Sequence, residues 1–423
     1  MSAQEPSVVR LKKGEERRLQ AGHLWVFSNE IDVAATPLKN FQPGSLVTIE
    51  SARGSTLGTG YINPRSLIAA RLCSRDASAL TPDWFVQRLQ NALQLRESFY
   101  AEPWYRLVHG EGDHMPGLVI DRFDRTLVVQ ITTAGMEQHT DTLIDALVSV
   151  VAPESILLRN DSPVRELEGL PSYQRAAVGS MPESISVREN ALVYEVPWMS
   201  GQKTGWFYDH RDNRAALAPL VANRRVLDCY SYMGAWACNA LAQGADYALC
   251  VDSSASAITA AQNNAELNQF TGQSARGQLE TRCGDAVEVL RDLRHQREQF
   301  DVIILDPPAF IKRRKDFRAG LAHYELNHRL AVALLNEGGV IVSASCSQPL
   351  SASDLSGAML KGARKHGYEL QLLHSLGQAR DHPVHAAMPE THYLKGFAGR
   401  LGSGRTRRLR QSEVLSNADT VSD

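Results

Sequence analysis

The most regular hydrophobic pattern in the chain begins at Asn223, where short apolar runs alternate with helical stretches. The expected strands are 225–229, 247–251, 279–283, 301–305 and 339–344, and the expected helices are 235–243, 254–268, 286–297 and 320–335. Strands that alternate with helices in this way build a doubly wound parallel sheet. The segments 368–373 and 392–401 can supply a closing hairpin. The pattern predicts an α/β fold with a Rossmann-like domain over residues 201–402.

Shorter strands separated by turn residues come before this domain. Residues 7–75 contain apolar runs such as 24–27, 45–49 and 57–62, at a spacing typical of a small β-barrel. From residue 77 to 200, an amphipathic helix around Trp84 is followed by a polar loop with glycines over 106–113, a hairpin at 118–131, a helix at 136–151 and further strands. We therefore predict a barrel over 1–76, an α+β connector over 77–200, and a mobile tail over 403–423.

Composition restricts the class of protein but not its partners. The chain has 423 residues, 43% hydrophobic and 22% charged, with a formal net charge of −2, so nucleic-acid contacts must come from local patches. Its six cysteines form no C-x-x-C pair, and no apolar run has the length of a membrane span. We expect a soluble cytoplasmic protein with reduced thiols, no membrane contact and no metal site. A homodimer is one alternative for its assembly.

The stretch 226–252 predicts a nucleoside site. One apolar strand ends at Asp228, a loop with a single glycine, Gly234, follows, and a second strand ends at Asp252. An acidic residue in that last position can accept both ribose hydroxyls, and the glycine lets the backbone approach the ligand. A pyrophosphate would need the three glycines of G-x-G-x-x-G, so a nicotinamide cofactor is disfavoured. The unit resembles the first motif of the class I S-adenosylmethionine methyltransferases.

Two further segments extend the predicted cofactor site. Asp285, after the third strand, can accept the amino group of an adenine, a role compatible with capping the next helix. The segment 201–214 combines glycines, aromatics and charges, and is either a linker or a lid over the cofactor. As a lid, it would stack an aromatic such as Phe207, and Lys203, Thr204 or Arg211 would meet the methionine carboxylate.

Residues that carry chemistry follow the fourth and fifth strands. Asp306-Pro307-Pro308-Ala309-Phe310 is a rigid turn that holds a carboxylate at the end of a strand. Methyltransferases use such a turn either to bind the amino group that they methylate or to contact the edge of a cytosine. Cys346, after the next strand, favours the second use, because carbon 5 of cytosine becomes nucleophilic only when a thiolate adds to carbon 6. Neighbouring cations or backbone donors must lower the pKa of that thiol.

With these motifs the chain closely resembles, over nearly its whole length, the bacterial PUA-domain-containing 23S ribosomal RNA cytosine-5 methyltransferases. The motifs that carry the resemblance are Lys12-Lys13-Gly14-Glu15, Gly22-His23-Leu24-Trp25-Val26-Phe27, Gly110-Glu111-Gly112-Asp113, Lys203-Thr204-Gly205, Asp228-Cys229-Tyr230-Ser231-Tyr232, Asp306-Pro307-Pro308, Asn336-Glu337-Gly338-Gly339, Ser345-Cys346-Ser347, Asp381-His382-Pro383 and Tyr393-Leu394-Lys395-Gly396-Phe397. The resemblance implies S-adenosylmethionine as cofactor, 23S ribosomal RNA as partner, Cys346 as nucleophile and Asp306 as its assistant at the base. The chain departs from the family at Ala235, where a second glycine is usual, and at Ala309, where a basic residue is usual. Many RNA cytosine-5 enzymes have a second cysteine at the position of Pro308, so product release here needs another base.

Two basic segments are candidates for RNA contact. Arg10, Lys12 and Lys13 lie close in sequence to Trp25, a combination that suits phosphate contact beside a stacking aromatic, although a solvated basic face is the alternative. Lys312 and Arg313 follow the Asp306 turn at the active-site edge, where phosphate contact is favoured. Two other functions stay open: an amino-group RNA methyltransferase that uses Asp306-Pro307-Pro308, and a noncatalytic RNA-binding protein. Four of the other five cysteines, Cys229, Cys238, Cys250 and Cys283, are predicted to be small core residues.

Overall fold

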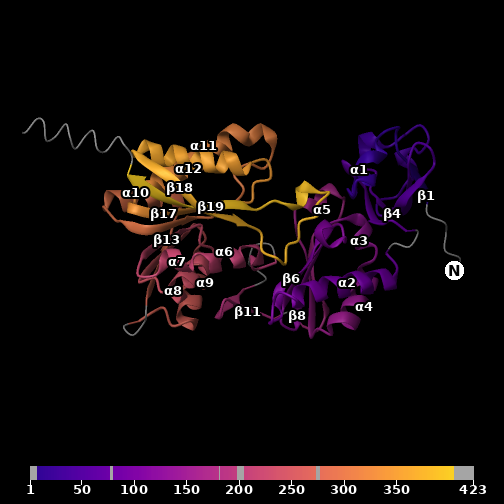
Figure 1. Cartoon of the computed structure of the whole chain (residues 1–423). Helices are drawn as coiled ribbons and strands as arrows, with labels where there is room; N and C mark the ends of the chain where they lie inside the picture. Colours follow the sequence, from indigo (N-terminus) through magenta and orange to yellow (C-terminus); the bar gives the residue numbers. More distant parts are fainter. Residues whose placement is uncertain (1–6, 77–79, 181, 198–203, 273–276, 404–423) are drawn as a thin grey trace, which may run out of the picture. The chain divides into compact units, whose positions relative to one another are not determined.

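The computed structural model describes residues 7–76, 80–180, 182–197, 204–272 and 277–403. The residues divide into two compact units. The first contains the described residues of 1–187, 197–208 and 380–392, and the second contains those of 188–196, 209–379 and 393–423. Figure 1 labels the elements of both units. The predicted mobile tail and Lys203 lie outside the described residues, apart from Ser403 of the tail, which ends the last strand.

The first unit begins with a five-stranded mixed sheet in the order β1-β3-β4-β5-β2. Its elements are β1 (Ser7–Arg10), α1 (Glu16–Gln20), β2 (Trp25–Phe27), β3 (Leu46–Glu50), β4 (Thr56–Ile62) and β5 (Ile68–Ser74). Alternate residues of β3 face inward, so that Val47 and Ile49 are fully buried. The strands expected from the apolar runs are therefore present.

A second sheet of the first unit has the order β10-β9-β8-β7-β6. Its elements are α2 (Pro82–Glu97), β6 (Trp104–His109), β7 (Leu118–Phe123), β8 (Thr126–Ile131), α3 (Ala134–Glu137), α4 (Thr140–Val151), β9 (Ser155–Asn160), α5 (Val164–Leu167) and β10 (Tyr173–Val178). Helices α2 and α4 pack against each other, and their apolar faces share one core with the sheet. The strands β11 (Ile185–Glu189) and β12 (Leu192–Val196) form a separate two-stranded sheet.

Two expectations about this region are wrong. Residues 106–109, expected in a loop, belong to β6, because the buried guanidinium of Arg106 is paired with the carboxylate of Asp121 at 2.5 Å. The single helix expected over 136–151 is divided into α3 and α4. Arg106 made this strand look like a polar loop in the sequence. The carboxylate that pairs with it, Asp121, lies 15 positions away, so the pairing is not visible in the local pattern.

The second unit is built on a seven-stranded sheet in the order β15-β14-β13-β16-β17-β19-β18. Its strands are β13 (Arg225–Cys229), β14 (Tyr247–Asp252), β15 (Gln278–Cys283), β16 (Phe300–Leu305), β17 (Leu335–Ser345), β18 (Tyr368–Gly377) and β19 (Lys395–Ser403). The first five are parallel, and β19 pairs antiparallel with both β17 and β18. The predicted doubly wound sheet and closing hairpin are thus both present.

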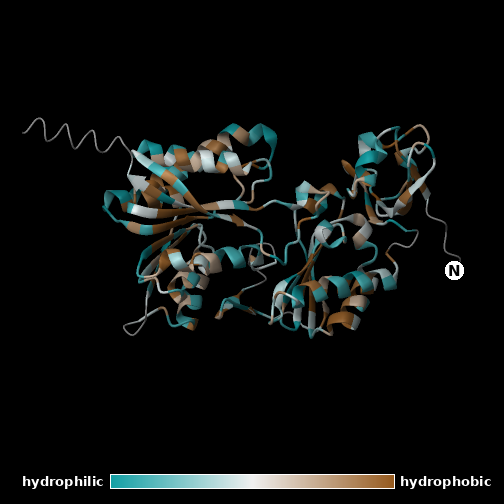
Figure 2. Cartoon of the chain, viewed as in Figure 1, coloured by the Kyte–Doolittle hydropathy of each residue, from teal (hydrophilic) through white to brown (hydrophobic). Residues whose placement is uncertain are grey.

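Helices cover both faces of this sheet (Figure 1). They are α6 (Arg211–Ala216), α7 (Ala218–Val221), α8 (Ala235–Ala242), α9 (Ala255–Leu267), α10 (Ala286–His295), α11 (Phe317–Val332) and α12 (Ala352–Lys365). Leu227 and Cys229 of β13 share a core with α10, α11 and α12, whereas Asp228 points to the α8 side. Much of the strands between the helical layers has the brown colour of hydrophobic residues in Figure 2. None of the described helices has both the length and the apolar character needed to cross a membrane.

Candidate active site

The predicted site residues of the second unit gather at one edge of its sheet. Asp228 lies near the end of β13, Asp252 ends β14, and Asp285 and Asp306 follow β15 and β16. Leu305 of β16 is in register with Ser343 of β17, so the Asp306 turn and the segment that contains Cys346 leave neighbouring strands at the same edge. Ligands of open parallel sheets bind at this edge, outside the carboxyl ends of the strands.

The loop between β13 and α8 has an unusual backbone conformation. Tyr230, Tyr232 and Gly234 have φ angles of +63°, +49° and +78°. A Cβ atom at Gly234 would lie only 3.1 Å from Cβ of Ala261 in α9, in a backbone region that side chains rarely adopt. The loop thus curls tightly over the sheet edge, and glycine is required where it enters α8. Tyr230 and Tyr232 adopt left-handed backbone conformations, which are strained for residues other than glycine. Such strain is common in ligand-binding loops.

Asp252 holds this loop in place. Its Oδ2 accepts a hydrogen bond from Tyr232 N at 2.9 Å, and its Oδ1 accepts one from Ser254 N at 2.9 Å. Each carboxylate oxygen has a second lone pair, so both can still accept from a ligand. Two hydroxyls of one ribose could use these lone pairs, and the contact of Asp252 with a ribose stays a prediction.

Asp228 differs from the other carboxylates because it is fully buried. Its Oδ2 accepts from Ala237 N in the first turn of α8 at 3.2 Å, while Oδ1 has no hydrogen-bond partner among the described residues. Burial raises the pKa of Asp228 well above its usual value, and the negative charges of Asp306 and Asp252 add to the shift. Asp228 therefore supports the loop through its hydrogen bond to the start of α8, and its other oxygen has no hydrogen-bond partner among the described residues.

Asp285 is the N-cap of α10. Its Oδ1 accepts from Val287 N at 2.9 Å and from Glu288 N at 3.1 Å. The side chain is exposed, and no hydrogen bond to its Oδ2 is present among the described residues. The cap uses one oxygen and leaves the other for an amino group. The two roles that the sequence suggested for Asp285 are thus geometrically compatible.

Asp306 is held by two side chains that the sequence did not single out. Its Oδ2 accepts from Trp236 Nε1 at 3.1 Å and lies 3.3 Å from Nε2 of His210. Burial alone would raise the pKa of Asp306, but the charge and hydrogen bond of His210 more than offset this, so the pKa is lowered. Asp306 is therefore an ionised acceptor, and its Oδ1 is left for a substrate.

Cys346 follows β17, whose last residue, Ser345, is paired in register with Lys395 of β19. Cys346 is half-buried, and it interacts electrostatically with Lys395, whose own pKa is lowered by burial. The Lys395 ammonium donates to the carbonyls of Ser347 at 2.6 Å and Leu350 at 3.0 Å, so it is fixed beside the thiol. A cation in this position is what a thiolate nucleophile needs.

A hydroxyl network ties the Cys346 segment to the Asp306 turn. Tyr324 of α11 shares hydrogen bonds with Ser345 Oγ at 2.7 Å and Ser347 Oγ at 3.0 Å, and Ile311 N donates to Ser347 Oγ at 3.2 Å. Phe310 packs edge-on against Tyr324, with ring centroids 4.9 Å apart. The two loops are therefore one packed structure, and Phe310 is part of it.

The other cysteines of this unit divide into two groups. Cys229, Cys238 and Cys250 are buried as predicted, and burial raises the pKa of Cys238 to about 12, so its thiol stays protonated. The prediction that Cys283 is a core residue is wrong, because its side chain is exposed at the end of the edge strand β15. Cys346 is thus the cysteine that combines partial exposure with a neighbouring cation.

Thr204 and Phe207, predicted to contact the cofactor, belong to the first unit. Thr204 is fully buried, and its hydroxyl donates to the carboxylate of Asp121. Phe207 is half-buried. Arg211, in the second unit, is also buried, with its Nε 3.8 Å from Glu189. The contacts of these three residues with a cofactor remain predictions.

The candidate RNA-binding residues have different environments. Arg10 is paired with Glu50 at 3.0 Å, and Lys12 donates to Asn29 O at 2.8 Å, while Lys13 is exposed. The indole of Trp25 donates to Glu111 at 2.7 Å, and its ring contacts His23 and Phe27 edge-on. Lys312 and Arg313 are exposed, and Arg313 is paired with Asp316 at 3.1 Å. Of these, Lys13 and Lys312 are the most available to phosphate.

The loop 109–114 has a structural role in the first unit. Glu111 accepts from Trp25, and Asp113 accepts from the guanidinium of Arg96 at 2.5 and 2.7 Å. Throughout the described part of the chain, no group of three or more His, Cys, Asp or Glu residues is arranged to hold a metal ion.

Three residues of the site were missed by sequence reasoning. His210 and Trp236 bind Asp306, and Lys395 lies beside Cys346. His210 lies in the segment 201–214, for which the sequence predicted cofactor contacts by aromatic and cationic residues only. Lys395 lies in one of the motifs that carry the family resemblance. For His210 and Lys395 the sequence identified the segment, but only the fold shows that these side chains lie beside Asp306 and Cys346.

Comparisons with known proteins agree with this architecture. Residues 9–75 match the family of PUA-like domains, and residues 213–349 match the family described as conserved hypothetical protein 95. Ribosomal RNA large subunit methyltransferase I of Serratia proteamaculans is 37% identical over 397 residues, which cover 92% of this chain and 98% of that protein. The enzyme of the same name from Yersinia pseudotuberculosis is 35% identical over 396 residues, with the same coverage.

Two solved structures resemble the whole chain. One, from Streptococcus mutans, is assigned there as a SAM-dependent methyltransferase and has a TM-score of 0.78 at 22% identity, covering 93% of this chain and 100% of that one. The other, an assigned methyltransferase complexed with SAH, has a TM-score of 0.78 at 22% identity and covers 94% and 100%. At this identity the likeness concerns the fold alone. It confirms the predicted fold class, a PUA-like domain followed by a Rossmann-like methyltransferase domain.

Proposed function

The chain belongs to the family of the ribosomal RNA large subunit methyltransferases I, and we propose that it methylates carbon 5 of a cytidine in 23S ribosomal RNA, with S-adenosylmethionine as methyl donor. In this proposal Cys346 is the nucleophile and Asp306 contacts the base. The observation that supports it most strongly is the placement of both residues on adjoining loops, with Lys395 beside the thiol.

The reaction assigns one task to each residue. The Cys346 thiolate adds to carbon 6, and the electron pair displaced from the ring double bond makes carbon 5 able to take the methyl group. A base then removes the carbon 5 proton, and the bond between sulfur and carbon 6 breaks to restore the thiolate. Asp306 accepts from the amino group of the cytosine through Oδ1, which lies opposite the oxygen held by His210 and Trp236. Lys395 favours the thiolate form.

The cofactor would bind at the loop 230–234. Asp252 would accept from the ribose hydroxyls, and Asp285 would accept from the adenine amino group through the oxygen that does not cap α10. Gly234 would allow the close approach of the ligand, and Asp228 would support the loop. The contacts of Lys203, Thr204 and Phe207 with the methionine end of the cofactor remain a prediction from the sequence. Bound there, S-adenosylmethionine supplies an electrophilic methyl group.

The packing of Phe310 favours the cytosine-5 reaction over its amino-group rival. An amino-group enzyme would use the aromatic of the Asp306-Pro307-Pro308 turn to stack on the base. Here Phe310 contacts Tyr324, His323 and Tyr230 within the protein, with centroid distances of 4.9, 5.6 and 6.2 Å. A noncatalytic RNA-binding protein, in turn, would have no use for the cation fixed beside Cys346.

Tritium release distinguishes these functions directly. The substrate would be 23S ribosomal RNA transcribed with cytidine labelled by tritium at carbon 5. Methylation at carbon 5 should release one tritium to water per methyl transferred, and Cys346→Ser should abolish both, by on the order of 10³-fold or more, while calorimetry shows intact S-adenosylmethionine binding. Cys283→Ser, at an exposed cysteine, is the matched control and should retain activity.

Two results would contradict the proposal. Methyl transfer without tritium release, insensitive to Cys346→Ser, would indicate the amino-group reaction. Absence of S-adenosylmethionine binding by the wild-type protein would indicate a noncatalytic RNA-binding protein.

A further inference from the structure

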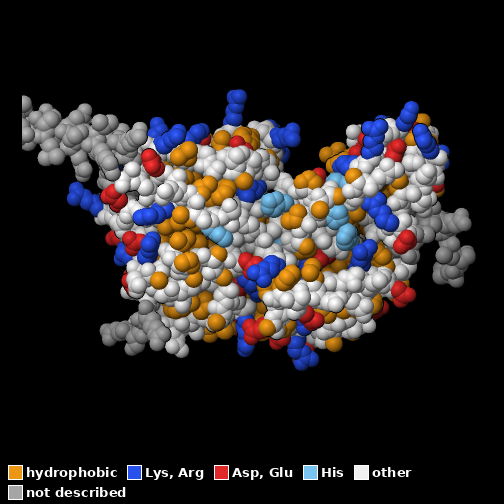
Figure 3. All heavy atoms as spheres, in the orientation of Figure 1, with side chains coloured by type: hydrophobic (Ala, Val, Ile, Leu, Met, Phe, Trp, Pro, Cys, Tyr) orange, Lys and Arg blue, Asp and Glu red, His pale blue; other side chains and the backbone are white. Residues whose placement is uncertain are grey.

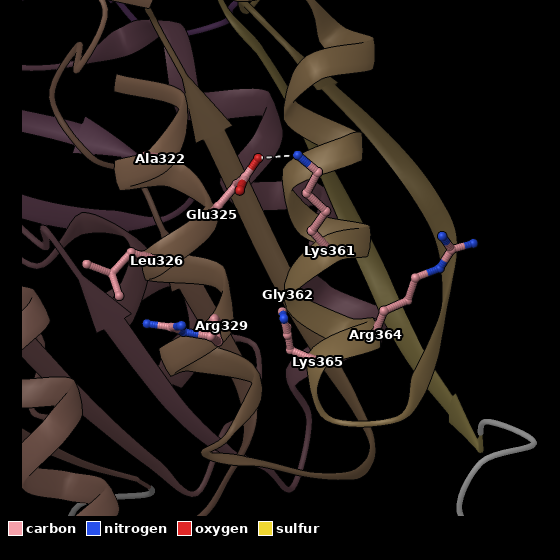
Figure 4. A pocket seen from close by; sticks show the side chains of 8 residues that line it. All are labelled: Ala322, Glu325, Leu326, Arg329, Lys361, Gly362, Arg364 and Lys365. Atoms are coloured by element: carbon pink, nitrogen blue, oxygen red, sulfur yellow. Dashed lines mark hydrogen bonds and ion pairs between the residues drawn. The ribbon is translucent and has the colours of Figure 1, made fainter. Parts of the chain in front are cut away.

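A basic groove lies between α11 and α12, outside every site described above. Its lining residues are Ala322, Glu325, Leu326, Arg329, Lys361, Gly362, Arg364 and Lys365. In Figure 4, Glu325 and Lys361 meet between the two helices, joined at 2.5 Å, whereas the guanidinium groups of Arg329 and Arg364 extend towards the outer sides of α11 and α12. We infer that this groove binds the phosphate backbone of the RNA substrate, an inference that rests on the proposed function for the identity of that RNA.

The charges of the groove are largely uncompensated. Only one carboxylate, Glu325, faces its four cations, and Lys361 is the one it pairs with. Arg329, Arg364 and Lys365 are exposed and have no side-chain hydrogen bond or ion pair with the described residues. Three residues with open guanidinium or ammonium donors therefore belong to the lining of one groove. Arginine and lysine in this state are the usual ligands of phosphate.

Helix dipoles account for only part of this charge. Arg329 lies in the last turn of α11, and Arg364 and Lys365 lie in the last turn of α12, where cations offset the negative ends of the helices. Each helix end carries roughly half a negative charge. The two ends together thus cancel about one of the three net positive charges of the groove, which leaves an excess that suits about two phosphates.

The shape of the groove favours a backbone over a base. None of the residues that line it is aromatic, so it offers no stacking surface. At Gly362 the two helices touch, because a Cβ atom there would lie 2.8 Å from Cβ of His328 and 2.9 Å from its carbonyl carbon. This close contact makes the floor of the groove from the packed backbones of the two helices. Such a floor accepts a sugar-phosphate strand of any sequence.

The position of the groove connects it with the active site. Helix α11 starts at Phe317, one residue beyond Asp316, which follows the exposed basic residues Lys312 to Lys315 after the Asp306 turn. From Arg318 to Arg329 the helix rises about 16 Å, so the basic residues before α11 and the cations of the groove lie at opposite ends of one helix. In Figure 3, Lys and Arg side chains gather over the region in which Figure 1 draws α11 and α12. An RNA strand that leaves the active site can follow this path.

The salt dependence of RNA binding tests the inference. Arg329→Gln combined with Lys365→Gln should weaken binding of a 23S ribosomal RNA fragment and reduce the slope of log K against log salt by about 0.7 for each phosphate that the protein no longer neutralises. The matched control, Arg291→Gln with Arg297→Gln, removes the same charge from exposed positions elsewhere in the second unit and should leave the slope unchanged. Each single variant should produce part of the effect. Unchanged S-adenosylmethionine affinity shows that the variants are folded.

Two outcomes would overturn the inference. One is a slope equal to that of the wild type, and the other is a weakening of binding no larger than that of the control. Because binding is measured without turnover, the result is independent of the reaction at carbon 5. A wild-type protein that binds the fragment but releases no tritium would refute the proposed function and leave the groove measurement valid.

Discussion

His210 Nε2 lies 3.3 Å from Asp306 Oδ2, and the rest of the imidazole is fixed by Asn213. Asn213 Oδ1 accepts from Gly377 N at 3.2 Å and its Nδ2 donates to Gly377 O at 2.8 Å, which sets the orientation of the amide. Asn213 Nδ2 therefore donates to His210 Nδ1 at 3.0 Å, and the ring proton is on Nε2, directed at Asp306. His210 donates to Asp306 in its neutral and its charged form alike.

Replacement of His210 should move the pH dependence of the reaction. Burial would lower the pKa of His210, but Asp306 and Asp209 raise it above its usual value, and His210 in return lowers the pKa of Asp306. In His210→Ala, the charge and hydrogen bond of His210 are lost and only the hydrogen bond from Trp236 still opposes the effect of burial, so the pKa of Asp306 rises. The acid limb of kcat/KM for RNA should then shift to higher pH. The rate at neutral pH should fall by about 10- to 100-fold, as expected for one missing hydrogen bond to a charged group.

A conservative variant separates this effect from a change in folding. His210→Gln keeps a donor within reach of Asp306 and should recover most of the rate, although without the charge of the imidazolium. His374→Ala, at an exposed position on β18, is the control. If His210→Ala shows the wild-type pH profile with a uniformly lower rate, the positioning role is refuted.

Removal of Lys395 should make Cys346 less reactive. The ammonium stabilises the thiolate, so Lys395→Met should raise the pKa of the thiol and shift the pH dependence of its alkylation by iodoacetamide to higher pH. Cys283 is exposed and would also react, so the measurement needs a Cys283→Ser background. Lys395→Arg retains the cation and should stay close to the wild type. Identical alkylation profiles for the Met and Arg variants would show that the charge has no effect on the thiol.

The second unit illustrates how much of a fold the sequence can predict. The sequence predicts the five parallel strands and four of the helices close to their observed bounds. Strands buried on both faces are continuous apolar runs, and the apolar residues of the helices between them recur with a clear helical period. Helix α12 was missed, although Ser351 and Asp354 form a capping box and Leu355, Ala358 and Met359 are buried at helical spacing. The signal was present, but small residues on the buried face made the apolar stripe narrow.

The candidate site was predictable only in part. Residues at the ends of parallel strands, such as Asp252, Asp306 and Cys346, could be placed together because the topology itself joins those ends. His210 and Lys395 could not, because they reach the site from segments about 96 and 49 positions away from Asp306 and Cys346 along the chain. Such contacts depend on tertiary packing, which periodicity does not encode. The boundaries of the three predicted domains remain a prediction.

Two substitutions at Asp285 can separate its cap from its proposed contact with adenine. Asp285→Ala removes the cap of α10 and should lower the free energy of unfolding by about 1 kcal/mol. Asp285→Asn keeps an oxygen for Val287 N and Glu288 N, so stability should be retained. Both variants should bind S-adenosylmethionine more weakly, because the second carboxylate oxygen is absent. Urea unfolding and calorimetry measure the two quantities separately, and wild-type affinity in Asp285→Asn would exclude the adenine contact.

Asp228 should reduce the stability of the protein at neutral pH. Its pKa is raised in the folded state, chiefly by burial, so between the unfolded pKa of about 3.9 and the folded pKa the native state binds more protons than the unfolded state. Stability therefore falls as pH rises through this window, by about 1.4 kcal/mol for each unit of the shift, and stays reduced above it. Asp228→Asn removes the ionisation while an amide oxygen can still accept from Ala237 N.

The variant should consequently unfold at a higher temperature than the wild type at pH 8, and the difference should shrink towards pH 4. In Asp228→Asn, the amide NH2 group takes the place of Oδ1, which has no hydrogen-bond partner among the described residues. The new donor is therefore buried without an acceptor, and this cost offsets part of the gain in stability. For this reason the pH dependence of the difference, and not its size at one pH, is the measurement that decides. Scanning calorimetry from pH 4 to 8 provides it, and a difference that does not change with pH would mean that the pKa of Asp228 is the same in the folded and the unfolded protein, which would refute the prediction.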